Sequence, residues 1–239
     1  MNKITILLFC FLTFEVFSFP IPKDNEVSFD IIRKNKTIGS VVTSFIQNDE
    51  TLKMKTIVDI NVKILFFPAY KFFQDTTETW VNDEFIEING YTDFEDEREY
   101  YINGIDKNNK FFASGMDGEL VLDNKILPLN YWNKKILDEE EVFDTQKGIV
   151  RKIIVNKEKN EIIEINDEKI ETEKYTLDAS KNPKDKGPFP TYTIWYKDNE
   201  LVKFEFINWK DNKKIITIRN DFIDKNIENI LFDFTNINI

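Results

Sequence analysis

The stretch LKMKTIVDINVKI (Leu52 to Ile64) decides the fold class of this chain. Apolar or β-branched side chains occupy every second position, and lysine, aspartate or asparagine fills most of the others, with Ile57 as the exception. A period of two is typical of a half-buried β-strand. At about 3.4 Å per residue this strand would be roughly 40 Å long, which suits a large curved sheet better than a compact immunoglobulin-like sandwich.

Shorter strands with turn signals between them surround this stretch. Asn82-Asp83 and Asp198-Asn199 are expected to connect hairpins, and Asn89-Gly90 and Asn103-Gly104 are expected to be turns as well. No long stretch with a helical period and no alternation of strands with helices is present. The sequence therefore predicts an all-β fold: a strongly curved antiparallel sheet, a half-barrel or partly closed barrel of about ten or more strands, with little helix.

Composition indicates one well-filled domain. Apolar residues make up 41% of the chain and aromatic residues 14%, which is enough for a sizeable core. We expect a single antiparallel β domain over residues 19–239, with a proline-rich loop over 182–190. For residues 221–239 the pattern favours a short helix followed by a strand. The net charge of −11 disfavours nucleic acid and anionic lipid headgroups as partners.

The N-terminus has the pattern of a secretory signal peptide. A cationic start with Lys3 precedes a mostly apolar segment, Ile4 to Phe14, and a small residue, Ser18, follows it. The apolar segment is too short to span a membrane, so we expect cleavage after Ser18 and a periplasmic protein without a membrane segment. An uncleaved anchor and a lipoprotein signal that uses Cys10 are the alternatives.

The residues that most enzymes need are scarce. The chain has no histidine, and its one cysteine, Cys10, lies in the predicted signal peptide. This composition removes Ser-His and Cys-His nucleophiles and the usual zinc, copper and iron ligands, so we expect no catalytic residues, no metal and no cofactor. Two acidic runs, 93–97 and 138–144, could serve a glycosidase or bind calcium, but they also fit solvated loops.

Aromatic residues supply the candidate site. In the hairpin that turns at Asp198-Asn199, Tyr196 is expected to face Leu201, and Trp195 is expected to share a side with Phe204. Such rings either form the core of the sheet or line an apolar cavity on its concave side. The predicted ligand-binding residues are Tyr70, Phe72, Trp80, Tyr131, Trp132, Trp195 and Phe204.

The sequence also resembles an uncharacterised family of secreted bacterial proteins, a domain of unknown function. The resemblance covers roughly Val27 to Arg219. It depends on Phe29-Asp30-Ile31 followed by Thr37-Ile38-Gly39-Ser40, on Tyr70, Phe72, Glu78 and Trp80, on Tyr131-Trp132, and on the late hairpin from Trp195 to Val202. Similar late hairpins occur in periplasmic lipoprotein carriers, whose half-barrel holds acyl chains. The resemblance thus implies a concave face that holds an apolar molecule.

These observations favour a non-enzymatic exported protein that binds an apolar or amphipathic ligand, such as a lipid or acyl chain, on the concave face of its sheet. The alternative is a structural or protein-interaction module with a fully packed core, whose partner binds at an edge strand. A carboxylate-dependent hydrolase is the third hypothesis.

Overall fold

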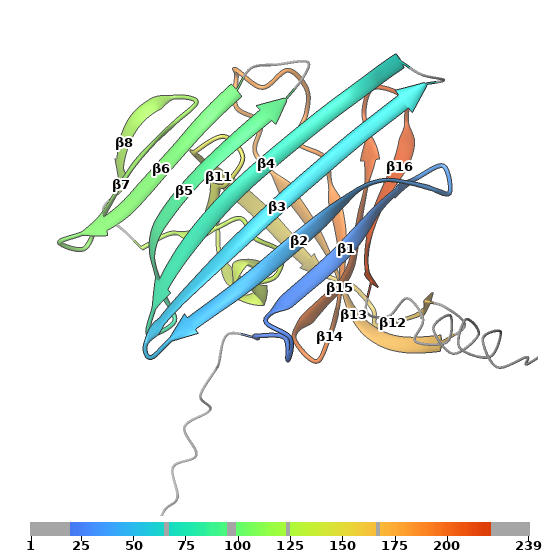
Figure 1. The fold of residues 1–239 in the computed structure, drawn as a ribbon, viewed down its shortest axis with the longest axis horizontal. Coiled ribbons are helices and arrows are strands. Elements are labelled where there is room, and N and C mark those ends of the chain that lie inside the picture. The colour runs from blue at the N-terminus through green and yellow to red at the C-terminus, as the bar shows by residue number, and fades with distance from the viewer. Residues whose placement is uncertain (1–19, 65–66, 95–98, 123–124, 166–167, 221–239) are drawn as a thin grey trace, which may run out of the picture.

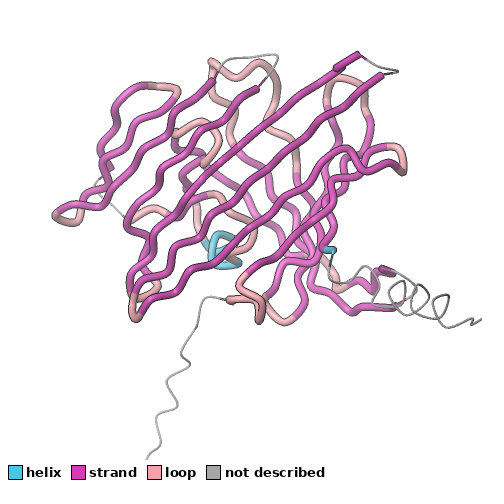
Figure 2. Tube along the Cα trace, in the orientation of Figure 1, coloured by secondary structure: helices cyan, strands magenta, loops and turns pink. Residues whose placement is uncertain are grey.

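A computed structural model describes residues 20–64, 67–94, 99–122, 125–165 and 168–220, and β-strands dominate it (Figures 1 and 2). The predicted signal peptide and the predicted helix and strand after Asp221 lie outside the described residues. A short 3-10 helix, η1 (Lys134–Asp138), lies between β9 and β10. The strands are β1 (Glu26–Arg33), β2 (Lys36–Asn48), β3 (Thr51–Ile64), β4 (Phe67–Val81), β5 (Glu84–Phe94), β6 (Glu99–Lys107), β7 (Lys110–Gly115), β8 (Gly118–Leu122), β9 (Leu127–Pro128), β10 (Glu141–Asp144), β11 (Ile149–Lys157), β12 (Glu161–Ile165), β13 (Glu168–Ala179), β14 (Tyr192–Lys197), β15 (Glu200–Asn208) and β16 (Lys213–Arg219).

All sixteen strands belong to one sheet, in the order β8-β7-β6-β5-β4-β3-β2-β1-β16-β15-β14-β13-β11-β10-β9, and β12 pairs with β13 beside this path. The first and last of the described strands meet within it, where Phe29 of β1 lies opposite Arg219 of β16. The sheet bends so that β2–β6 pass in front of β11 and β13–β15 in the view of Figure 1. The predicted all-β, strongly curved sheet with little helix is confirmed.

The long strand follows the predicted alternation. Leu52 and Met54 of β3 are buried in the main core, whereas Lys53 and Lys55, which alternate with them, are exposed. The turn at Asn82-Asp83 fixes the register of β4 against β5. Both turn residues have φ above 50°, the left-handed conformation that a two-residue hairpin requires. As a result Trp80 lies opposite Phe85, with ring centroids 5.3 Å apart.

Two expected turns are strand interior instead. Gly90 lies within β5 opposite Ile102, and Gly104 lies within β6 opposite Ile88. At Gly104 an added Cβ would come within 2.4 Å of the Phe111 ring, so the glycine makes room for that ring to cross the strand. Neither Asn-Gly dipeptide reverses the chain, and at Gly104 the glycine serves packing instead.

The late hairpin also departs from the predicted pairing. Asp198-Asn199 forms the expected turn, with φ of 50° and 66°, and Tyr196 does face Leu201. Beyond that pair the register shifts, so Trp195 lies opposite Lys203. The shift places Trp195 on the outer face of the sheet, in a small core with Val202 and Ile163, whereas Phe204 packs against the main core on the inner face. The expectation that Trp195 and Phe204 share a side is wrong, because a β-bulge changes the facing of alternate residues.

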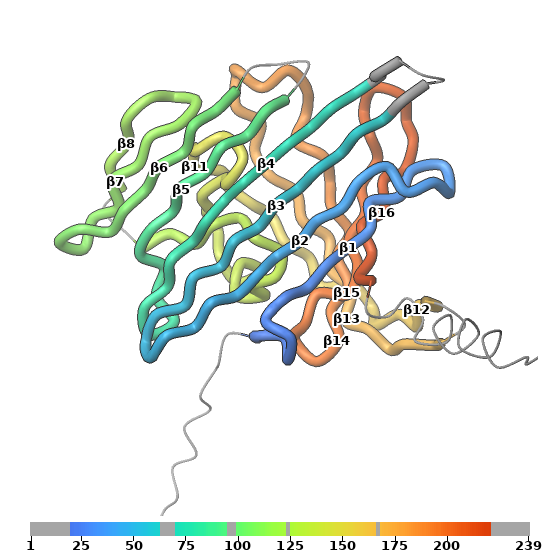
Figure 3. Tube along the Cα trace, in the orientation of Figure 1, coloured from blue at the N-terminus to red at the C-terminus, as the bar shows by residue number. Residues whose placement is uncertain are grey.

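One connecting segment of the chain fills much of the concave side. Residues 125–148 leave β8 and pass between the layers before they enter β11 (Figure 3). Trp132 of this segment packs against Phe29 and Phe45, with ring centroids 6.5 and 5.7 Å away. Its indole nitrogen donates to the carbonyl oxygen of Pro20 over 2.7 Å. Ile136 and Phe143 are also fully buried. The main core therefore has three layers, in which the segment 125–148 lies between the two walls of the curved sheet.

Candidate binding site on the concave face

The structure separates the seven predicted ligand-binding residues into four groups. Trp80 and Trp132 are core residues with 1% and 3% of their surface exposed. Trp195 lies on the outer face. Tyr131 and Phe204 contact each other on the inner face, with ring centroids 5.1 Å apart. The two remaining residues belong to β4: Phe72 is buried against Phe94, and Tyr70 lies partly buried opposite Val62 of β3.

Tyr131 and Phe204 belong to a larger group of rings that we call the aromatic cluster. Its members are Tyr131, Phe189, Tyr192, Phe204 and Phe206, and every one is partly exposed. Tyr192 is at the centre, with ring centroids 4.9 Å from Tyr131, 5.5 Å from Phe189 and 5.1 Å from Phe206. Sequence reasoning missed Phe189, Tyr192 and Phe206. The period of two around Ile194 and Phe204 could have indicated the last two of them.

The register of the sheet carries the inner face from this cluster across to the long strands. Phe204 lies opposite Thr217 of β16, which lies opposite Ile31 of β1. The same row continues through Gly39, Ile60, Phe72 and Phe94 of β2, β3, β4 and β5. Ile60 and Phe94 are partly exposed, as are Val41 and Val58 in the neighbouring row. An apolar and incompletely covered inner wall therefore extends from the aromatic cluster to β5.

The tyrosine hydroxyl groups of the cluster are turned away from water. Burial raises the pKa of Tyr192 to about 12 and raises that of Tyr131 well above its ordinary value. The two hydroxyl groups share a hydrogen bond, and the hydroxyl of Tyr196 donates to the carbonyl oxygen of Tyr131 over 2.6 Å. A molecule that reaches this site would meet ring surfaces and not free hydroxyl groups.

A buried ionic network holds one side of the cluster in place. Arg151 donates to Asp144 over 2.6 Å and to Asp185 over 2.9 Å, and Lys147 contacts Asp185 at 3.0 Å. Burial alone would raise the pKa of Asp185, but the hydrogen bonds from Arg151 and Lys147 outweigh it and lower that pKa to about 2. The Arg151 guanidinium also lies 5.0 Å from the Phe189 ring. The network thus fixes the loop 182–190 and its ring beside Tyr192.

A single buried carboxylate ties the inserted segment to the wall. The Nδ2 atom of Asn130 donates to Glu78 of β4 over 3.2 Å, and the indole nitrogen of Trp80 donates to it over 3.1 Å. Burial raises the pKa of Glu78 to about 7, against these two hydrogen bonds, which lower it. Because Asn130 precedes Tyr131, this contact helps to position the aromatic cluster.

The two acidic runs of the sequence do not assemble into one site. Asp138 to Glu141 are exposed, Asp144 is paired with Arg151, and Asp93 lies 3.7 Å from Lys71. Residues 95–97 lie outside the described part of the chain. Over the residues that the structure describes, no three aspartate or glutamate side chains gather as metal ligands would.

Two solvent-open cavities lie on the outer face. One, of about 430 Å³, lies between β12 and the outer faces of β16 and β1. The other, of about 400 Å³, lies over β5–β8 and includes Ile105, Phe112 and Val121. Phe112 lies opposite both Ile105 and Val121, and among the described strands β8 pairs only with β7, so this apolar row ends at an edge of the described sheet. Among the described residues, no helix is long and apolar enough to cross a membrane.

Comparisons with known proteins agree with this architecture. The family model of a domain of unknown function, DUF6134, matches residues 29–217. The crystal structure of a β-barrel-like protein of the domain of unknown function DUF1849, from Brucella abortus, superimposes with a TM-score of 0.57 at 12% identity. The superposition covers 81% of this chain and 94% of the Brucella chain, and at that identity it shows a shared fold alone. Among curated proteins, none matches this sequence.

Proposed function

The chain belongs to the DUF6134 family, and from its half-barrel we propose that it is a non-enzymatic binding protein for an apolar or amphipathic molecule, such as a lipid or acyl chain. The ligand would lie on the inner wall against the aromatic cluster. One observation supports this most: Tyr131, Tyr192, Phe204 and Phe206 stay partly exposed on the inner face, although residues around them, such as Ile31 and Thr217, are buried.

The physical reason is the free energy of covering apolar surface. Each 100 Å² of apolar surface that a ligand removes from water contributes on the order of 2.5 kcal/mol before the cost of association is subtracted. The hydroxyl groups of Tyr131 and Tyr192 already have partners, so they add little recognition of polar groups. The site is therefore expected to select acyl chains or other apolar groups over polar molecules.

Export is part of the proposal. The signal-peptide pattern of residues 1–18 would deliver the chain to the periplasm, where lipids and lipid precursors are the abundant apolar molecules. A chain with net charge −11 would bind such molecules by burial of their apolar parts and not by attraction to anionic headgroups.

A different observation favours the second candidate, a structural or protein-interaction module. Trp132, Ile136 and Phe143 of the inserted segment fill a large part of the concave side. If the inner face serves stability alone, partners would bind elsewhere, and β8, which in the described part of the chain pairs only with β7, offers an edge for strand addition.

Displacement of a fluorescent hydrophobic dye by fatty acids separates the two candidates. The binding hypothesis expects displacement from the wild-type mature chain and a clear loss of it in Phe206→Ser. The matched control is Phe112→Ser, the same change at an outer-face ring that is 40% exposed, which should bind as the wild type does. Native mass spectrometry of protein from its own periplasm should show a bound apolar molecule. No displacement and no bound molecule would refute the binding hypothesis and leave the interaction module.

A further inference from the structure

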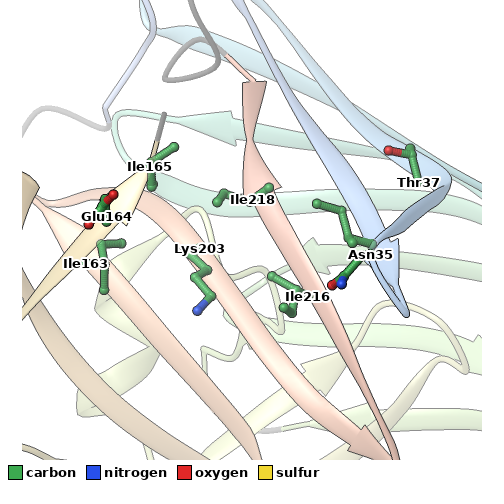
Figure 4. A pocket seen from close by; sticks show the side chains of 9 residues that line it. Asn35, Thr37, Ile163, Glu164, Ile165, Lys203, Ile216 and Ile218 are labelled. Carbon is green, nitrogen blue, oxygen red and sulfur yellow. The ribbon is translucent and has the colours of Figure 1, made fainter. Parts of the chain in front are cut away.

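The larger outer cavity is an apolar groove with two distinct walls (Figure 4). Ile163 and Ile165 of β12 line one side, and Asn35 and Thr37 at the β1–β2 turn line the other. Its floor is the outer face of the sheet. The floor residues are Ile32, Lys203, Ile216 and Ile218. We call this cavity the outer groove.

The groove exists because the β12–β13 hairpin folds over the outer face. Ile163, Ile165 and Ile170 of the hairpin pack with Trp195 and Val202 into the small outer core. The hairpin does not cover the outer face beyond this small core. Ile218 packs against the edge of the outer core, and Ile216 lies opposite Ile32 on the adjacent strand, where the floor stays partly exposed.

Isoleucine side chains lie on this outer face of the sheet, where water would otherwise contact them. The solvent side of an antiparallel sheet ordinarily carries polar side chains, as β3 does with Lys53, Lys55 and Asp59. On β16 and β1 three outer positions instead carry Ile216, Ile218 and Ile32, and Asp30 lies opposite Ile218. Adjacent apolar groups on the floor of a groove are typical of a surface that another segment covers.

We propose that the C-terminal segment, residues 221–239, binds in the outer groove of its own chain. The described chain ends at Asn220, two residues beyond Ile218 of the groove floor. The segment is too apolar to be a mere solvated tail. Its apolar residues are Phe222, Ile223, Ile227, Ile230, Leu231, Phe232, Phe234, Ile237 and Ile239.

The covalent connection favours this occupant over a second copy. At about 3.3 Å per extended residue, only a few residues after Asn220 suffice to reach any part of the groove. A short tether of this kind gives the C-terminal segment an effective concentration at the groove in the millimolar range, which is above the concentration of other copies of the chain in dilute solution. The proposal concerns the outer face and is independent of ligand binding on the inner face.

Photocrosslinking in the full mature chain tests the proposal. The photoreactive residue p-benzoylphenylalanine replaces Glu164 in one variant and Thr37 in another, because these two residues lie on opposite walls of the groove. A third variant carries it in place of Tyr101, which is 67% exposed on the outer face of β6, away from the groove. We expect cross-links from the two groove positions to peptides of residues 221–239 within one chain, and none from position 101.

Two outcomes would overturn the proposal. Groove positions that cross-link only to other peptides, or to nothing, show that the segment does not bind there. Cross-links that join two chains on a denaturing gel show that a second copy is the occupant. As a further check, Ile218→Ser added to the variant that is labelled at position 164 should lose the intramolecular cross-link while circular dichroism shows an intact sheet. A cross-link that persists unchanged in that intact variant would also contradict the proposal.

Discussion

The indole nitrogen of Trp80 donates a hydrogen bond to the carboxylate of Glu78 over 3.1 Å, and both side chains are almost completely buried. Residues two apart on a strand share a face, so the carboxylate of Glu78 lies directly beside the core residue Trp80. Asn130 supplies the second donor. A buried carboxylate with only two side-chain donors makes the inner wall sensitive to pH.

The stability of the fold should therefore fall as pH rises towards neutrality. Burial raises the pKa of Glu78 from 4.5 to about 7, so the folded chain holds this proton more tightly than the unfolded chain. The resulting stabilisation is complete below about pH 4.5 and is lost as pH rises through about 7. Glu78→Gln should remove this dependence and raise the free energy of unfolding at pH 8 by on the order of 2 kcal/mol.

Urea unfolding at pH 5 and pH 8 measures this effect. Glu87→Gln, the same change on the outer side of the neighbouring strand, is the control and should keep the pH dependence of the wild type. If the free energy of unfolding of Glu78→Gln depended on pH as that of the wild type does, the carboxylate of Glu78 would not be the cause of the pH dependence.

Gly104→Ala should destabilise the sheet by about 1–3 kcal/mol. The new Cβ would approach Phe111 to 2.4 Å and Ile88 to 2.9 Å, so the core would have to shift. Gly90→Ala is the matched control on the adjacent strand, because its nearest contact there, with Thr76, would be an ordinary 3.4 Å. The midpoints of urea unfolding compare the two variants, and equal midpoints would refute the packing role of Gly104.

Arg151→Met should cost about 3–5 kcal/mol of unfolding free energy. The change leaves Asp144 and Asp185 buried without the guanidinium that pairs with both. Lys152→Met is the control on the next residue, where the side chain is 80% exposed and the ion pair with Glu141 is long, at 3.9 Å. That variant should change stability by less than about 0.5 kcal/mol. Thermal unfolding of both variants checks the difference, and similar losses would contradict it.

Trp195→Phe should reduce stability without altering dye displacement. The change removes the hydrogen bond from the indole nitrogen to Glu161, over 3.1 Å, and weakens the contact with Lys203, whose Nζ lies 4.2 Å from the ring. We expect a loss of about 1–2 kcal/mol. Because Trp195 lies on the outer face, fatty acids should still displace the dye as in the wild type. A loss of displacement would place the ligand on the outer face instead.

The sequence predicted the features that depend on local patterns. The alternation in Leu52 to Ile64 predicted the long half-buried strand, and Asn82-Asp83 predicted a hairpin turn, because these residues tolerate positive φ. The family resemblance and the curved all-β fold are likewise confirmed. Each of these depends on neighbours in the chain or on recurring motifs.

Features that depend on distant contacts escaped prediction. Gly104 looked like a turn residue because its true partner, the ring of Phe111, crosses from another strand. Trp195 was expected on the side of Phe204 because a bulge leaves no clear mark in the sequence. Phe189 reaches the aromatic cluster from a loop that the buried pair of Arg151 and Asp185 holds in place, which no periodicity reveals. Whether the cluster binds a ligand stays a prediction.

The pairing of β1 with β16 has a consequence for biogenesis. The seam between β1 and β16, the first and last of the described strands, holds the two halves of the sheet together, so this sheet cannot be completed until β16 has been synthesised. Contacts this distant in sequence form slowly. If the chain is exported as proposed, a slow completion of the sheet would help it to cross the membrane before it folds. The pairing of β1 with β16 would then close the described sheet only after β16 has been exported.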